Sequence, residues 1–314
     1  MRKTEYSDTK KLPSKTSVTI IRGISVVFGF FIQVDSSFRP QPVNAIEDSS
    51  KGSVASSNIV SPPRAAGKLA IDGEASRIFL KAQQCENDGD FKFAQQFYEQ
   101  VIEVEPDFIY AWSNLGNVLT AEGNLRDALL CYKKALSLGP PRQTSAIILL
   151  NKASIEVSQG ENAAALRDME IAESYIGPES SILTNKAVAF SNLGRWQEAC
   201  SIFEKVISTA DRNALPWWLR YSMSLLETSR GTEAVAFLQR TLNRYPTEPE
   251  CIAFAVALYQ GLGNPQEASL YWNRLQDSDR VLYSSTTFVA DNLHWGKKAV
   301  SGLSAFLKGP YYNT

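Results

Sequence analysis

The side chains that most often do chemistry are sparse in this 314-residue chain. There is one histidine, His294, and neither a Gly-x-Ser-x-Gly motif nor a glycine-rich phosphate loop occurs. A nucleophile needs a base within hydrogen-bond reach, and the sequence offers no such pairing. The paired carboxylates Glu103/Glu105 and Asp168/Glu170 are expected on solvated helix or loop faces. We therefore predict that the chain is not an enzyme and holds no cofactor.

Metal binding is also excluded by the sequence. Zinc sites use closely spaced Cys or His ligands, but no two of the four cysteines are spaced as Cys-x2-Cys. We predict no metal site and expect the thiols to pack as small apolar groups. Their spacing assigns no disulfide. They are Cys85, Cys131, Cys200 and Cys251.

Charge is unevenly distributed, although the formal net charge is only −1. Residues 1–45 hold seven Lys/Arg and three Asp/Glu, so the rest of the chain carries a net charge of −5. A nucleic-acid-binding surface needs clustered cations that displace counterions from phosphates. A slightly acidic body therefore argues against nucleic acid as a partner.

The basic N-terminal region has the features of a targeting signal. Val18–Val34 is the most apolar run of the chain, with ten uncharged residues from Gly23 to Ile32. A membrane-spanning helix needs about 20 apolar residues, whereas the core of a signal peptide needs about 7–15. Val43-Asn44-Ala45 then supplies the small residues of a cleavage site. We predict that residues 1–45 are removed; the alternative is an anchor retained through residues 18–34, the chain's only membrane contact.

Two amphipathic helical patterns occupy Tyr110–Arg142 and are separated by a break at Glu122–Asn124. Pro140-Pro141 ends the second pattern because proline cannot continue a helix. The spacing Trp-x2-Leu-Gly, then Ala-x3-Tyr-x2-Ala and a closing Pro, resembles a tetratricopeptide repeat, a unit of about 34 residues. The residues that carry this resemblance are Trp112, Leu115, Gly116 and Leu119, then Ala128, Tyr132 and Ala135.

The same positions recur at near-constant spacing, which predicts about six units. Small residues such as Gly116, Ala153 and Ala187 let the first helix of a unit approach the second. The fifth unit is the least regular, because Ser222 replaces the small apolar residue and Gly231 lies two places late. The matching alanines of the second helices are Ala94, Ala128, Ala165, Ala199, Ala234 and Ala268.

The resemblance implies an all-α fold, a right-handed α-solenoid of about six helix pairs. We predict a leader over residues 1–45 and a disordered Ser-, Pro- and Gly-rich linker over residues 46–73. The repeat array then covers residues 74–280, and capping helices with a tail cover residues 281–314. The stripe Ala299, Val300, Leu303, Phe306 and Leu307 within Lys297–Lys308 predicts a helix that covers the last apolar face.

The resemblance also implies a concave groove lined by the first helix of each unit. At the family's groove positions, units two to five carry no Lys or Arg. Asn117 matches one position of the Lys/Asn/Arg clamp with which some family members hold acidic chaperone tails, but the cations that make the strong hydrogen bonds are absent. We therefore exclude that ligand and predict an apolar or weakly polar peptide or helix of a partner protein. The candidate groove residues are Tyr110, Asn117, Ile147, Leu150, Val157, Val188, Leu219, Met223 and Leu226.

Two adjacent tryptophans mark the start of the fifth unit. Trp218 occupies a core position of the repeat, whereas Trp217 falls on another face. An exposed tryptophan would be a good anchor for a partner. The alternative is that Trp217 packs against the preceding unit.

The sequence thus favours a non-catalytic interaction scaffold or assembly chaperone. Two alternatives stay open: a helical-repeat RNA binder, whose basic groove positions are absent here, and a structural protein that self-associates through Trp217 or the C-terminal helix. The segments Ala111–Leu138, Leu149–Ser154 and Ala214–Tyr221 are similar to plant plastid repeat proteins directed to the thylakoid. This similarity implies a location in the chloroplast, with the thylakoid lumen as the compartment within it; the alternative is the secretory pathway.

Overall fold

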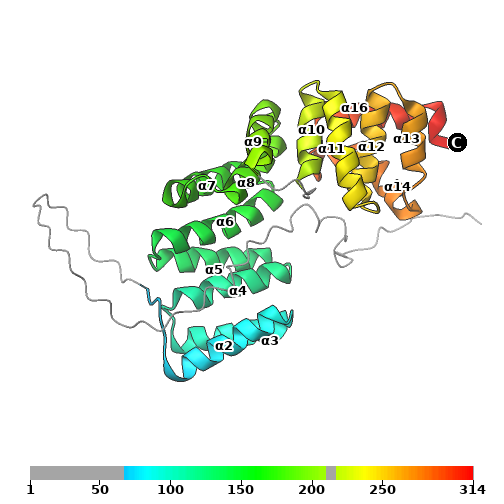
Figure 1. Cartoon of the computed structure of the whole chain (residues 1–314). Helices are drawn as coiled ribbons and strands as arrows, with labels where there is room; N and C mark the ends of the chain where they lie inside the picture. Colours follow the sequence, from blue (N-terminus) through cyan, green and yellow to red (C-terminus); the bar gives the residue numbers. More distant parts are fainter. Residues whose placement is uncertain (1–66, 210–216, 314) are drawn as a thin grey trace, which may run out of the picture.

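The computed structural model describes residues 67–209 and 217–313, which form α-helices joined by short turns (Figure 1). The single β-type contact in these ranges is a backbone bridge between Lys68 and Phe108. None of the helices described is long and apolar enough to cross a membrane. The predictions for the leader, and for the linker as far as residue 66, lie outside the described residues.

Twelve of the helices form six consecutive pairs. The two helices of a pair pack together, and each second helix also contacts the first helix of the next pair. This arrangement confirms the predicted all-α array. The pairs are α2 (Gly73–Asn87) with α3 (Phe91–Val104), α4 (Ile109–Ala121) with α5 (Leu125–Ser137), α6 (Arg142–Ser158) with α7 (Asn162–Ile176), α8 (Ser180–Asn192) with α9 (Trp196–Thr209), α10 (Trp218–Glu227) with α11 (Gly231–Arg244), and α12 (Pro249–Gly261) with α13 (Pro265–Trp272).

Small residues set the distance between the helices of a pair, as the sequence predicts. A Cβ atom at Gly116 would lie 2.6 Å from a ring carbon of Tyr132, so α4 and α5 approach closely only because residue 116 has no side chain. The alanines of the second helices are fully buried at the same interfaces. The two helices of each pair therefore share an apolar interface, and short turns join one helix to the next.

The turn between the two helices of a pair has a left-handed residue. Five pairs use glycine there, with φ between 72° and 81°, a conformation that costs glycine little. In the fifth pair Ser229 takes the left-handed conformation, with φ 66°, and Gly231 begins α11 instead. The irregular fifth unit thus keeps the turn conformation of the other units and differs only in the residue type that adopts it. The five glycines are Gly89, Gly123, Gly160, Gly194 and Gly263.

The C-terminal residues form α14 (Asp277–Tyr283), α15 (Thr286–Asp291), α16 (Lys297–Lys308) and the 3-10 helix η1 (Pro310–Asn313). Phe306 of α16 and Tyr312 of η1 contact Trp272 of α13, with ring centroids 5.6 and 5.5 Å away. The predicted covering of the last pair is therefore present. In addition, α16 packs along α12 and reaches back to α10 (Figure 1).

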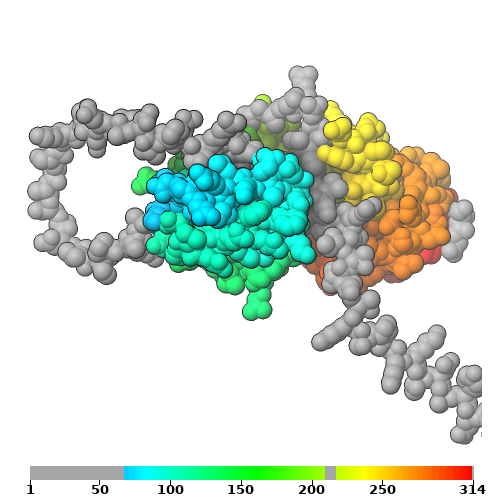
Figure 2. All heavy atoms as spheres, turned by 90° about the horizontal axis from the view of Figure 1, so that it is seen from below, coloured from blue at the N-terminus to red at the C-terminus, as the bar shows by residue number. Residues whose placement is uncertain are grey.

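The array places its first and last pairs far apart. In the view from below, the helices up to α5 lie at one end of the molecule and the helices beyond α11 lie at the other (Figure 2). The concave positions of successive first helices are therefore spread along the molecule, and each stretch of the groove can be considered separately.

Candidate protein-binding groove

Asn117 is fixed at the centre of the first stretch of the groove. Its Oδ1 accepts hydrogen bonds from the Tyr132 hydroxyl, at 2.7 Å, and from Asn151 Nδ2, at 2.9 Å. These bonds tie together α4, α5 and α6. The Asn117 amide nitrogen has no partner among the described residues, and the side chain is partly exposed. It is therefore positioned to donate a hydrogen bond to a ligand.

A second polar chain connects α4 to the first pair. Asn114 Nδ2 donates to the Tyr98 hydroxyl, at 3.3 Å, and that hydroxyl donates to Glu86 Oε2, at 2.5 Å. Burial, followed by the charge of Glu86, raises the pKa of Tyr98. Burial also raises the pKa of Glu86. The Tyr98 phenol therefore stays protonated, and Asn114 has a structural role in joining α4 to the first pair.

Three candidate groove residues keep part of their side chains accessible: Tyr110, Asn117 and Ile147. Leu150, Val157 and Val188 do not, since they are only 2, 4 and 8% exposed and belong to a continuous apolar core. The expectation that these three line an open groove is corrected, because their side chains pack on neighbouring helices.

The last stretch of the groove is filled by the chain itself. Leu219, Met223 and Leu226 of α10 are 1, 0 and 6% exposed, so the expectation that they contact a partner is corrected as well. The C-terminal segment packs on this helix. The Leu293 carbonyl accepts from Arg220 Nη1 at 2.6 Å. Glu227 Oε1 accepts two backbone N–H groups in the first turn of α16, from Lys298 at 2.9 Å and Ala299 at 3.0 Å.

The sixth unit is covered in the same way. A Cβ atom at Gly302 would overlap the Ala257 carbonyl oxygen, so α16 lies directly on the backbone of α12. Trp295 Nε1 donates to Glu250 Oε1 at 3.2 Å. Glu250 in turn faces Arg220, at 3.4 Å, and both side chains are at most 4% exposed. Glu250 and Ala257 hold the positions that Tyr110 and Asn117 hold in the second unit, so the segment Leu293–Lys308 occupies the concave side.

Trp217 does not provide an exposed anchor. Its side chain is 3% exposed and stacks on Phe203 of α9, with ring centroids 5.2 Å apart and planes at 6°. The packing alternative is therefore the one observed. The sequence pattern does not show this stacking, so it left both alternatives open.

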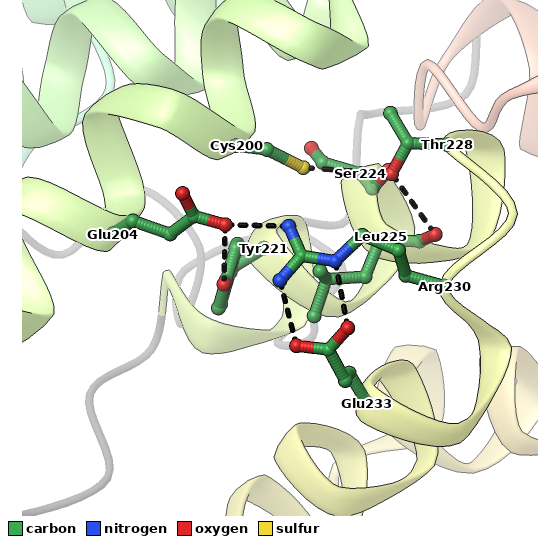
Figure 3. Close-up of polar contacts among 8 residues, drawn as sticks. All are labelled: Cys200, Glu204, Tyr221, Ser224, Leu225, Thr228, Arg230 and Glu233. Atoms are coloured by element: carbon green, nitrogen blue, oxygen red, sulfur yellow. Dashed lines mark hydrogen bonds and ion pairs between the residues drawn. The ribbon is translucent and has the colours of Figure 1, made fainter.

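Polar contacts strengthen the junction between the fourth and fifth pairs (Figure 3). Arg230 bridges Glu204 of α9, at 2.5 Å, and Glu233 of α11, at 2.6 Å. The hydrogen bond from Arg230 lowers the pKa of Glu233. Tyr221 also donates to Glu204, at 3.4 Å. These contacts connect the two parts of the chain on either side of residues 210–216.

The remaining chemistry-bearing residues are held in packing roles. Three of the four cysteines are buried and all four are free, and burial raises the pKa of Cys131 to about 11. His294 has a φ of 53°, and burial, followed by Arg220, lowers its pKa. Within residues 67–209 and 217–313, no three His, Cys, Asp or Glu side chains lie together as metal ligands.

Two segments of the sequence match the tetratricopeptide repeat family, at residues 109–140 and 182–216. Together with the six helix pairs, these matches make the chain a tetratricopeptide repeat protein. A stretch of 103 residues is 31% identical to the photosystem I assembly protein Ycf3 of Cyanophora paradoxa. The match covers 32% of this chain and 58% of that protein, so the chain spans little more than half of this relative's length.

Solved structures share the fold at low sequence identity. PilW, described as a widely conserved type IV pilus biogenesis factor, superposes with a TM-score of 0.56 at 14% identity, over 74% of this chain and 100% of that chain. A tetratricopeptide repeat protein from Parabacteroides merdae gives a TM-score of 0.56 at 16% identity, over 75 and 99% of the two chains. At these identities the likeness shows the fold alone.

Proposed function

We propose that this protein is a non-catalytic scaffold that binds an uncharged, polar or apolar segment of a partner protein along the concave side of its first four helix pairs. The observation that carries this proposal is the difference in access along the groove. The C-terminal segment covers the concave side of α10 and α12, whereas Tyr110, Asn117 and Ile147 keep accessible surface.

The chemistry of this open stretch suits a peptide backbone. A buried backbone N–H or C=O group must find a hydrogen-bond partner, and amides and hydroxyls can both donate and accept. Partly exposed residues of this kind at the groove positions of α4, α6 and α8 are Asn117, Ser154, Ser181 and Asn192. Tyr110 and Ile147 add apolar surface for a side chain of the ligand.

The distant similarity to a photosystem I assembly protein supports a role in assembling a protein complex. We extend it to a location in the plastid, with photosystem I subunits as the first partners to test. The plastid location is tested by its own experiment, separate from the one that tests the groove.

The groove is tested by affinity capture from intact tissue with the full chain. The double variant Tyr110→Ala/Ile147→Glu should lose about tenfold or more of the captured partner, because a charge in an apolar contact costs about 2 kcal/mol or more. The matched control is Phe93→Ala/Leu130→Glu on second helices, where both residues are more than half exposed. Equal capture by the groove variant and the wild type, with both folded by circular dichroism, would refute the groove proposal.

The compartment is tested by fusing residues 1–45 to a fluorescent protein. We expect the fusion to enter plastids. A purely cytosolic signal would contradict the plastid location while leaving the groove proposal intact.

A further inference from the structure

α16 has two faces of opposite character. Its buried face consists of Ala299, Gly302, Leu303 and Phe306, which pack toward α12 and α13. At 3.6 residues per turn, the centre of the stripe formed by Lys297, Ser301, Ser304 and Lys308 lies about 180° away. Because α16 fills the groove, this second stripe becomes the accessible surface at the C-terminal end of the concave side.

The stripe is part of a hollow. With Thr286 and Ala290 of α15 and the apolar side chains of Trp295, Val300 and Ala305, these residues line an open depression of about 580 Å³. Lys297 and Lys308 stand at opposite ends of α16, about 16 Å apart along the axis. The depression therefore suits a segment of chain lying along α16 better than it suits a single small ion.

The polar groups of this hollow lack internal partners. Many helix serines in the described residues, such as Ser158, Ser224 and Ser284, donate to a carbonyl of their own helix. Ser301, Ser304 and both lysines of the stripe have no hydrogen bond or ion pair within the described ranges. Residues 292–314 contain three lysines and no Asp or Glu. Two carboxylates do lie close by, Asp291 at the end of α15 and Glu227, which contacts the start of α16, but in the described ranges neither forms an ion pair with Lys297 or Lys308.

We propose that the hollow between α15 and α16 binds an acidic peptide segment of a partner protein. An ammonium group only donates hydrogen bonds, a hydroxyl can donate one, and an ionised carboxylate only accepts them. Two cations about 16 Å apart match carboxylates separated by roughly five residues of extended chain. The charge selects an anionic occupant, and the length selects a chain rather than a free phosphate.

This surface is distinct from the groove of the proposed function. It shares no residue with Tyr110, Asn117 or Ile147, and it carries cations where the groove positions of units two to five carry none. The two sites can therefore be removed separately, and failure of one leaves the other standing.

The test is fluorescence anisotropy of a labelled twelve-residue peptide of alternating Glu and Ser, titrated with the full chain at low salt. The variant Lys297→Ala/Lys308→Ala should raise the Kd by about fivefold, because each exposed ion pair contributes little alone. Substituting Gln for Glu in the peptide should weaken binding at least as much, and added salt should weaken binding of the Glu peptide. Tyr110→Ala/Ile147→Glu should leave it unchanged.

The control variant is Lys81→Ala/Lys92→Ala, which removes two exposed lysines from the first pair and the same net charge. An equal loss of affinity in this control would show a nonspecific charge effect and overturn the proposal. So would unaltered peptide binding by the Lys297→Ala/Lys308→Ala variant. Competition arms use anionic vesicles and a single-stranded oligonucleotide. Tighter binding of either through the same lysines would assign the hollow to a membrane or nucleic acid and overturn the acidic-peptide assignment.

Discussion

The concave positions of α4, α6 and α8 include asparagine and serine side chains that keep part of their surface accessible, whereas those of α10 and α12 are largely apolar and buried. In α12 every residue from Glu250 to Tyr259 is buried, because α11, α13 and α16 enclose it. A first helix that is open on one side needs polar residues there, but one that is covered on every side does not. The difference in composition therefore distinguishes the stretch of the groove that stays open from the stretch that the C-terminal segment of the same chain covers.

This comparison also separates two kinds of variant. A charge introduced into the open stretch stays near water, whereas a charge introduced under α16 has no solvent and no room. The same substitution at an accessible groove position and at a buried one should therefore have very different consequences for stability.

The largest effect is expected from Leu219→Glu, which places a carboxylate at a site that is 1% exposed. An unpaired buried charge belongs to the few changes that cost about 5 kcal/mol. Ile147→Glu, in the partly exposed stretch, should cost less than about 1 kcal/mol. Urea unfolding followed by circular dichroism measures both. Similar losses in the two variants would mean that the two stretches do not differ in burial.

The next effect tests the ion pair under the C-terminal segment. Arg220→Met leaves Glu250 buried without its cation, at a cost of about 3–5 kcal/mol. Adding Glu250→Leu should recover at least half of the loss, since an apolar pair of similar volume can replace a buried ion pair. The single variant should also speed hydrogen exchange in α16, because Arg220 holds the Leu293 carbonyl. A double variant no more stable than the single one would show that the pair itself is not the source of the loss.

The sequence predicted the array well because the interface between helices of a pair is local. Gly116 and Tyr132 lie 16 residues apart, and the repeat pattern alone predicts that one must be small where the other is large. The helix Lys297–Lys308 and its apolar stripe were predicted for the same reason. The location of that helix was not fully predicted, because it depends on contacts from Lys298 to Glu227, 71 residues away, that leave no periodic signal. The sequence pattern also did not show that Leu219, Met223 and Leu226 are buried.

A pH effect is expected at the start of α12, where Glu248 is the N-cap residue. Burial, followed by Glu250 and Asp279, raises the pKa of Glu248 to about 7 from 4.5. Because the folded pKa is the higher one, its stabilising contribution is full below pH 4.5 and is lost as pH rises toward 7. Glu248→Gln should remove this loss, worth about 1 kcal/mol once solvent screening is allowed for. Urea midpoints at pH 4.5 and 8 measure it.

Glu233→Gln supplies a control of opposite sign. Arg230 lowers the pKa of Glu233, so that carboxylate contributes stability above its unfolded pKa and loses it as pH falls. The two variants should therefore change the pH dependence in opposite directions. A pH profile of Glu248→Gln that parallels the wild type would rule out Glu248 as the titrating group.

The smallest effect concerns the turn of the fifth pair. Ser229 has a φ of 66°, a conformation that costs a non-glycine residue about 1–2 kcal/mol. Ser229→Gly relieves this strain but makes the unfolded chain more flexible and loses the hydrogen bond from Lys298 Nζ, at 2.6 Å. We expect a net gain of about 0.5 kcal/mol. The reverse change in the open half, Gly123→Ser, should cost about 1 kcal/mol, because residue 123 has a φ of 81° and gains no such bond. Thermal unfolding measures both variants. If Ser229→Gly destabilises the chain, the hydrogen bond from Lys298 of α16 outweighs the backbone strain. The C-terminal helix would then contribute more to the stability of this turn than the turn's own backbone conformation does.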